Sequence, residues 1–285
     1  MTTLVAEPFD GSLAQRLAGQ EAADACFYWL GQAGFLLAFA GRRILIDPYL
    51  SDSLAEKYRG KAFSHERMMP APISTAELGK VDVVLVTHHH TDHMDPATLA
   101  PIAATNPDCR FVVPRASLDE AQRRIGVGHE RLIALDAGEN FAPFDGVHVT
   151  VIRAAHEALE RSAEGWHRFL GYVVQVGAAK LYHSGDTIPF DGLVEEVEAH
   201  APDIALLPVN GRRAELTAAG IAGNLTLSEA IDLAGAIGAG HMIGHHYGMF
   251  AFNTAPAEAI DQAAAAHTCR PQIHRARTGV EYRIF

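Results

Sequence analysis

One apolar run that ends abruptly in histidines constrains this chain more than any other feature of its sequence. Val81–Val86 reads Val-Asp-Val-Val-Leu-Val, which is typical of a buried β-strand. After Thr87 the chain continues His88-His89-His90-Thr91-Asp92-His93. The sequence therefore predicts a polar cluster at the end of a strand, where the chain turns toward a helix near Pro96.

The spacing within this cluster predicts a metal site with two sets of ligands. His88 and His90 are two residues apart, so both side chains can face the same side of an extended segment. They can chelate one cation while Asp92 and His93 bind a second, and the cations of such sites lie about 3.5–4 Å apart. His89 lies between two ligands and is expected to point away. A merely polar loop is the alternative, which the specific pattern disfavours.

The bulk composition excludes several classes of protein. The chain has 285 residues, of which 48% are hydrophobic and 20% charged, and we predict one globular domain over residues 1–285. No stretch approaches the roughly 20 apolar residues of a membrane span. The formal net charge of −11 disfavours a nucleic-acid partner, because that binding depends on Lys and Arg contacts to phosphates.

The N-terminus and the cysteines predict a reducing compartment. Met1–Asp10 contains no basic run followed by an apolar core, so we expect a cytoplasmic protein. Cys26, Cys109 and Cys269 lie far apart without CxxC spacing. Buried, reduced thiols are therefore favoured over a disulfide framework or a thiolate metal site.

Short β-rich runs alternate with helical signals along the chain. Capping boxes at Ser74/Glu77, Ser117/Glu120 and Thr226/Glu229, and the segment Thr254-Ala255-Pro256, predict helix starts. Turns at 31–34 and 41 favour antiparallel hairpins. Strands are expected at Phe27–Leu30, Phe35–Phe39, Arg43–Ile46, Val81–Val86, Arg110–Val113, Val147–Ile152, Tyr172–Val176, Lys180–Tyr182, Ile204–Val209 and Met242–Ile243. This order favours an α/β fold with a mixed sheet, or two packed sheets with helices outside.

The signature His88-x-His90-x-Asp92-His93 resembles that of the metallo-β-lactamase superfamily, and the likeness extends over about residues 27–252. The resemblance implies a four-layer αββα sandwich of two mixed β-sheets flanked by helices. It also implies three further ligands: His156 for the first metal, Asp186 as a carboxylate that bridges both metals, and His246 for the second. His245 remains an alternative to His246.

The same resemblance suggests roles for residues around the metals. Asp47, after the strand Arg43–Ile46, is expected to orient a metal-binding histidine, with a plain turn residue as the alternative. His183 is either a neighbour of Asp186 or a core histidine. If the substrate carries phosphate, Arg212 is the favoured partner among the loop arginines, with a solvated surface charge as the alternative for each of Arg161, Arg168, Arg212 and Arg213. Further polar groups that could line the pocket are Asn210, Asn224, Tyr247 and, if it binds no metal, His245.

Several short segments resemble the L-ascorbate-6-phosphate lactonase branch of the superfamily. This resemblance implies a lactonase-like hydrolase of a small metabolite, with or without phosphate, that uses two divalent ions, Mn²⁺ or Zn²⁺, and can form a homo-oligomer. Asp92 and Asp186 are the expected catalytic carboxylates. The alternatives are a phosphodiesterase or nuclease and, from another class, a metal-binding partner protein without catalysis. The segments concerned are Leu30–Phe35, Leu181–Pro189, Leu206–Arg212, Gly223–Leu225 and His246–Asn253.

Overall fold

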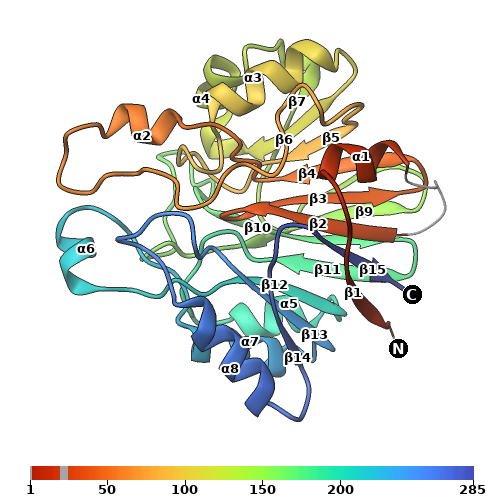
Figure 1. The fold of residues 1–285 in the computed structure, drawn as a ribbon. Coiled ribbons are helices and arrows are strands. Elements are labelled where there is room, and N and C mark those ends of the chain that lie inside the picture. Colours follow the sequence, from red (N-terminus) through yellow and green to blue (C-terminus); the bar gives the residue numbers. More distant parts are fainter. Residues whose placement is uncertain (1, 20–24) are drawn as a thin grey trace. The chain divides into compact units, whose positions relative to one another are not determined.

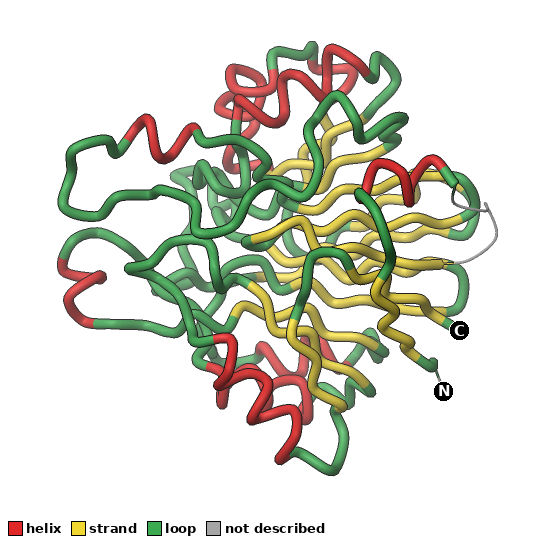
Figure 2. Tube along the Cα trace, viewed as in Figure 1, coloured by secondary structure: helices red, strands yellow, loops and turns green. Residues whose placement is uncertain are grey.

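The computed structural model describes residues 2–19 and 25–285, which fall into two compact units. The N-terminal unit comprises Thr3–Ala134, Met249–Phe252 and Arg277–Phe285, and the C-terminal unit consists mainly of Leu135–Gly248 and Asn253–Ala276. Each unit contains one β-sheet with its own helices (Figures 1 and 2). That residues 1–285 form one domain stays a prediction.

The sheet of the N-terminal unit is mixed. Neighbouring strands from β1 to β4 run antiparallel, whereas β4, β5 and β6 are parallel. In order across the sheet, its strands are β1 (Leu4–Pro8), β15 (Val280–Ile284), β2 (Ala25–Gly31), β3 (Gly34–Phe39), β4 (Arg42–Ile46), β5 (Val83–Leu85), β6 (Arg110–Pro114) and β7 (Leu132–Leu135). The carboxyl ends of β4 and β5 therefore lie at the same edge of this sheet.

Helices of the N-terminal unit cover one face of its sheet. α3 packs on α4, which contacts β6, and a buried apolar cluster joins Leu99 and Ile102 to Leu45, Val84 and Phe111. The chain enters α3 after Asp95, whose carboxylate accepts the Ala97 N–H, with a proline at the first helical position. The helices are α1 (Leu13–Ala18), α2 (Ser53–Lys57), α3 (Pro96–Thr105) and α4 (Leu118–Ile125), with 3₁₀ turns at Arg115–Ser117 and His129–Arg131.

The sheet of the C-terminal unit is mixed as well. Strands β8 to β11 pair antiparallel, and β11 to β14 pair parallel. Helix α7 contacts β12 and β13, and α8 contacts β14. The strands are β8 (Asn140–Phe144), β9 (Val147–Arg153), β10 (Leu170–Val176), β11 (Ala179–His183), β12 (Ile204–Pro208), β13 (His241–His245) and β14 (Gln272–Arg275); the helices are α5 (Leu193–Glu198), α6 (Ala214–Ala218), α7 (Leu227–Ala236) and α8 (Ala257–Ala266).

Every strand predicted from the sequence overlaps a strand of the structure, but one is shorter and others were missed. β5 covers only Val83–Leu85 of the expected Val81–Val86, because the Val81 N–H donates to the Asn106 side chain instead of a strand. The strands missed are β1, β7, β8, β14 and β15. β1 and β8 each bury at most one of their five residues, so they carry no apolar run that a sequence pattern can detect.

One expected helix start, one expected capping box and one cysteine are corrected by the structure. Ser74 does bond to Glu77, but the segment forms a single turn and no helix follows. Ser117 precedes α4 without a side-chain cap, because Glu120 pairs with two arginines of the same helix. Cys26 and Cys109 are buried free thiols, whereas Cys269 is exposed in a polar segment after α8. None of the described helices is long and apolar enough to cross a membrane.

Candidate metal centre

In the N-terminal unit, the ends of two parallel strands bring Asp47 and Thr87 together. Asp47 follows β4, Thr87 comes shortly after β5, and the Asp47 N–H donates to the Leu85 carbonyl at 2.9 Å. Both side chains are fully buried. Asp47 adopts φ +43°, a conformation that costs a non-glycine residue about 1 kcal/mol or more and that is found mainly at functional sites.

The Asp47 carboxylate orients two histidine rings. It accepts the N–H of Thr87 at 2.8 Å and the hydroxyl of Thr87 at 2.5 Å, and its Oδ2 lies 2.7 Å from Nδ1 of His93. The Thr87 oxygen lies 3.0 Å from Nδ1 of His88. Because the Thr87 proton is donated to Asp47, the Thr87 oxygen accepts from His88. Both histidines therefore carry hydrogen on Nδ1 and present the lone pair of Nε2, the form that binds a metal.

His90 and Asp92 lie beside these rings in a tight turn. The backbone N–H groups of His93 and Met94 both donate to the His90 carbonyl, at 3.1 and 2.8 Å. The rings of His88 and His90 have centroids 4.7 Å apart, and Nε2 of His93 lies 3.8 Å from Oδ2 of Asp92. Each of the four predicted ligands of this run belongs to at least one candidate group of metal-binding residues.

In the C-terminal unit, two histidine side chains converge on one oxygen of the Asp186 carboxylate. His156 follows β9, Asp186 follows β11 and His246 follows β13. Oδ2 of Asp186 lies 3.8 Å from Nε2 of His156 and 3.3 Å from Nε2 of His246. All three are at least 96% buried, and His246 adopts φ +59°. His156, Asp186 and His246 each belong to a candidate group of metal-binding residues.

His245 and His183 lie apart from these contacts and stack on each other. Their ring centroids are 5.1 Å apart with an interplanar angle of 21°, and both are fully buried. Burial, and then the neighbouring His183, holds the pKa of His245 well below its usual value, so this ring is neutral. Nδ1 of His183 accepts the Gly185 N–H at 3.1 Å. His183 therefore supports the turn that carries Asp186 and is also a core histidine.

The predicted substrate residues make contacts within the protein. Arg212 donates to the Asn224 carbonyl at 2.9 Å and pairs with Glu229 at the start of α7. Tyr247 donates to the Ala276 carbonyl and accepts from Arg275 at 3.0 Å. Arg212 thus links its loop to helix α7, and Tyr247 links the segment after β13 to Arg275 and Ala276. Asn210 bonds to two other asparagines, described below.

Three residues near the candidate ligands escaped sequence reasoning. Gln32 donates its amide N–H to Oδ2 of Asp92 at 2.9 Å. His65 stacks on Tyr58 at 4.1 Å; burial lowers the pKa of His65, and the Asp92 charge opposes that shift. Thr87 completes the Asp47 network. No spacing rule singles out these residues, because each is distant in sequence from its partner or is an ordinary residue type.

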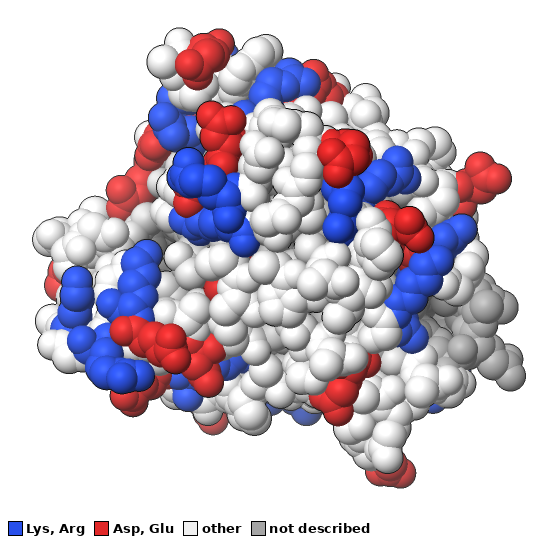
Figure 3. Space-filling view, turned by 90° about the horizontal axis from the view of Figure 1, so that it is seen from above, with Lys and Arg blue, Asp and Glu red and all other residues white. Residues whose placement is uncertain are grey.

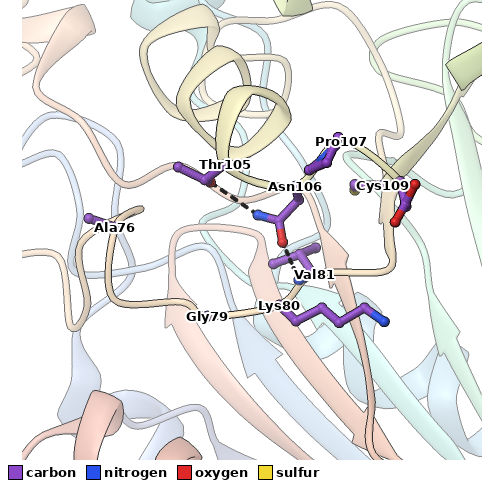
Figure 4. A pocket seen from close by; sticks show the side chains of 9 residues that line it. Ala76, Gly79, Lys80, Val81, Thr105, Asn106, Pro107 and Cys109 are labelled. Carbon is purple, nitrogen blue, oxygen red and sulfur yellow. Dashed lines mark hydrogen bonds between the residues drawn. The ribbon is translucent and has the colours of Figure 1, made fainter.

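A cavity of about 450 Å³ lies at the opposite ends of β5 and β6 (Figure 4). The Asn106 side chain accepts the Val81 N–H at 2.8 Å and donates to the Thr105 hydroxyl at 3.1 Å. These hydrogen bonds hold the wall of the cavity in place and are part of the fold. It is lined by Ala76, Gly79, Lys80, Val81, Thr105, Asn106, Pro107, Asp108 and Cys109.

Comparison with known proteins identifies the family to which this chain is similar. A family model described as a β-lactamase superfamily domain matches residues 42–247. A UPF0173 metal-dependent hydrolase of Rubrobacter xylanophilus is 29% identical over 259 residues, covering 89% of this chain and 94% of that protein. One from Caldivirga maquilingensis is 30% identical over 185 residues, covering 64% and 69%. The metallo hydrolase Igni18 of Ignicoccus hospitalis superposes with a TM-score of 0.67 at 19% identity, covering 92% and 99%.

The chain therefore belongs to the metallo-β-lactamase superfamily, in its UPF0173 family of metal-dependent hydrolases. The predicted fold class is confirmed as two mixed β-sheets with flanking helices. The function that follows at this level is metal-dependent hydrolysis. The matched region contains all seven predicted ligands and Asp47.

Proposed function

We propose that this chain is a lactonase-like hydrolase of a small metabolite and works with two divalent ions, Mn²⁺ or Zn²⁺. The proposal rests on the arrangement of hydrogen bonds around Asp47, because this arrangement fixes His88 and His93 in the tautomer that binds a metal through Nε2. The donors are imidazole nitrogens and carboxylate oxygens, which suit both ions. The residues that would hold the ions are those predicted from the sequence, namely His88, His90, Asp92 and His93 in the N-terminal unit and His156, Asp186 and His246 in the C-terminal unit.

Divalent ions held by such residues supply Lewis acidity, which lowers the pKa of water and stabilises negative charge on a substrate oxygen. The remaining proton transfer needs a group of this chain. Asp92 is the candidate, because its side chain is 18% exposed whereas that of His93 is fully buried. Gln32 holds one Asp92 oxygen by its amide N–H. We assign to Asp92 the transfer of the proton lost by the attacking water to the ring oxygen that leaves when the lactone opens.

A phosphodiester or nucleic-acid substrate is the second candidate, and the observations do not favour it. The net charge is −11. On the face drawn in Figure 3, Lys and Arg lie among Asp and Glu without forming a basic stripe. Arg212, the favoured phosphate partner, is paired with Glu229. A small substrate bound mainly by neutral polar groups therefore fits better.

The test is hydrolysis of L-ascorbate 6-phosphate, γ-butyrolactone and bis(p-nitrophenyl) phosphate by purified protein with added Mn²⁺ or Zn²⁺. We expect metal-dependent lactone turnover that Asp186→Ala abolishes and that Asp52→Ala, an exposed carboxylate, leaves unchanged. Asp92→Asn should lower kcat by about 10²–10⁴-fold, the usual contribution of a positioned acid or base. Turnover of the phosphodiester alone would move the assignment to the second candidate.

A further inference from the structure

Three asparagine side chains form a directional hydrogen-bond chain in the C-terminal unit. Nδ2 of Asn224 donates to Oδ1 of Asn210 at 3.1 Å, and Nδ2 of Asn210 donates to Oδ1 of Asn253 at 2.9 Å. Their exposed fractions are 0, 6 and 9%. Because an amide oxygen accepts and an amide nitrogen donates, the three amides share one direction, which runs from Asn224 through Asn210 to Asn253.

The chain is anchored at the strand ends that carry candidate ligands. The Val209 N–H donates to the His245 carbonyl at 3.0 Å, so Val209 continues the register beside His246, and Asn210 follows it directly. The Leu225 N–H, next to Asn224, donates to the carbonyl of Thr187 at 2.9 Å, one residue after Asp186. The backbone thus holds the first two asparagines beside the two ligand-bearing segments.

The third asparagine lies on the loop that follows His246. The Gly248 N–H donates to the Thr254 hydroxyl at 2.7 Å, and this bond closes the loop next to Asn253. Asn253 is therefore held both by its own backbone segment and by the Asn210 amide.

The chain of amides ends in a hydrogen-bond donor. Oδ1 of Asn253 accepts a hydrogen bond from Asn210. Among residues 2–19 and 25–285, Nδ2 of Asn253 donates to no acceptor. Nδ2 of Asn253 is not fully buried, so solvent reaches it. A side chain that is 91% buried, fixed at its oxygen and open at its nitrogen is preorganised to bind an oxygen atom of a ligand.

We propose that Asn253 binds an oxygen of the substrate, and that Asn210 and Asn224 are positioning residues that act through it. The ligand class is a small molecule with a hydrogen-bond-accepting oxygen, namely the lactone carbonyl and the carboxylate of the hydroxy-acid product. The identity of that molecule rests on the proposed function. The orientation of Asn253 rests only on the three side chains.

The experiment measures binding of D-gluconate, a hydroxy-acid probe, to the Mn²⁺-loaded protein by titration calorimetry. We expect Asn253→Ala to weaken binding by about 10-fold or more, the range for a hydrogen bond to a charged group. Asn140→Ala, an exposed asparagine of β8, is the matched control and should change nothing. Gluconate that binds Asn253→Ala as tightly as the unaltered chain, or that does not bind at all, overturns the proposal.

A double-variant cycle separates positioning from a merely structural role. Asn210→Ala alone should weaken binding by a smaller factor, and Asn210→Ala with Asn253→Ala should be no weaker than Asn253→Ala alone. Additive effects would contradict positioning through Asn253. If an alanine variant fails to fold, Asn253→Asp keeps the acceptor for Asn210 and replaces the donor by an oxygen, so it should fold and bind gluconate more weakly still.

The two proposals fail in different ways. Lactones that are not hydrolysed, with gluconate binding that still depends on Asn253, would sink the proposed function and leave this inference standing. Lactones that are hydrolysed with KM unchanged in Asn253→Ala would do the reverse.

Discussion

Asp47 shows how one buried residue can organise the ligands around it. Its carboxylate accepts both donors of Thr87 and lies at bonding distance from the ring of His93. The family resemblance suggested an orienting acid at this position, but the part played by Thr87 required coordinates. The sequence shows where a histidine lies in the chain. Which ring nitrogen faces the metal depends on hydrogen bonds between residues some forty positions apart, so it cannot be predicted from the sequence.

We predict that Asp47→Ala lowers metal affinity by about 10–100-fold, because orienting partners of ligand histidines typically contribute that much. Competition with a chromophoric chelator measures the affinity, and Asp52→Ala, in the exposed turn before α2, is the control. An Asp47→Ala protein that retains its metal as tightly as the control would contradict the orienting role.

Asp136 and His167 form a second buried pair, outside the candidate ligands. The Asp136 carboxylate accepts the backbone N–H of His167 at 2.9 Å and lies 3.0 Å from its Nδ1. Asp136→Ala would leave buried donors unsatisfied, so we expect a loss of about 1–3 kcal/mol in unfolding free energy. Urea unfolding checks this against Asp145→Ala, an exposed turn residue. Equal midpoints for the two variants would show that the pair contributes nothing.

At the scale of elements, most buried strands were predictable and edge strands were not; the buried strand β15, which lies between β1 and β2, is the exception. β3, β4 and β12 are runs of apolar residues, and these runs survive in the structure nearly to the residue. β1 and β8 lie at sheet edges and expose most of their side chains, so their existence depends on a partner strand distant in sequence. The capping-box pattern was a poor guide by itself, because Ser74 bonds to Glu77 where no helix follows, whereas Ser117 precedes α4 without a side-chain cap.

The helix α7 offers a direct test of this distinction. Thr226 accepts the Glu229 N–H, and Glu229 accepts the Thr226 N–H, which forms a complete capping box. Thr226→Ala should therefore destabilise the protein by about 1 kcal/mol. Ser117→Ala should cost only a few tenths, because Ser117 makes no side-chain cap to α4. Chemical denaturation compares the two variants, and a larger loss for Ser117→Ala would refute the assignment.

At the scale of the whole molecule, stability should depend on pH through buried histidines. Burial lowers the pKa of His274 to about 4, and it also lowers that of His241, whose ring nitrogen lies 3.3 Å away. In the unfolded chain these groups titrate near 6.5, so below that pH the unfolded state binds more protons. The unfolding free energy should thus be highest above about pH 6.5 and fall as the pH drops toward 4.

Unfolding at pH 7 and pH 5 measures this dependence. We expect a loss of about 1–2 kcal/mol from His274 between these values, and a smaller loss in His274→Gln. A variant whose stability falls with pH as steeply as that of the unaltered chain would assign the dependence to other groups.

The seven candidate ligands come from both units, four from the N-terminal and three from the C-terminal. The measurement that tests the central claim most directly is the metal content of the reconstituted chain by mass spectrometry. The account predicts two equivalents of Mn²⁺ or Zn²⁺ per chain, with a loss of metal in both His93→Ala and Asp186→Ala. A chain that binds no metal, or whose metal content neither variant changes, would contradict it.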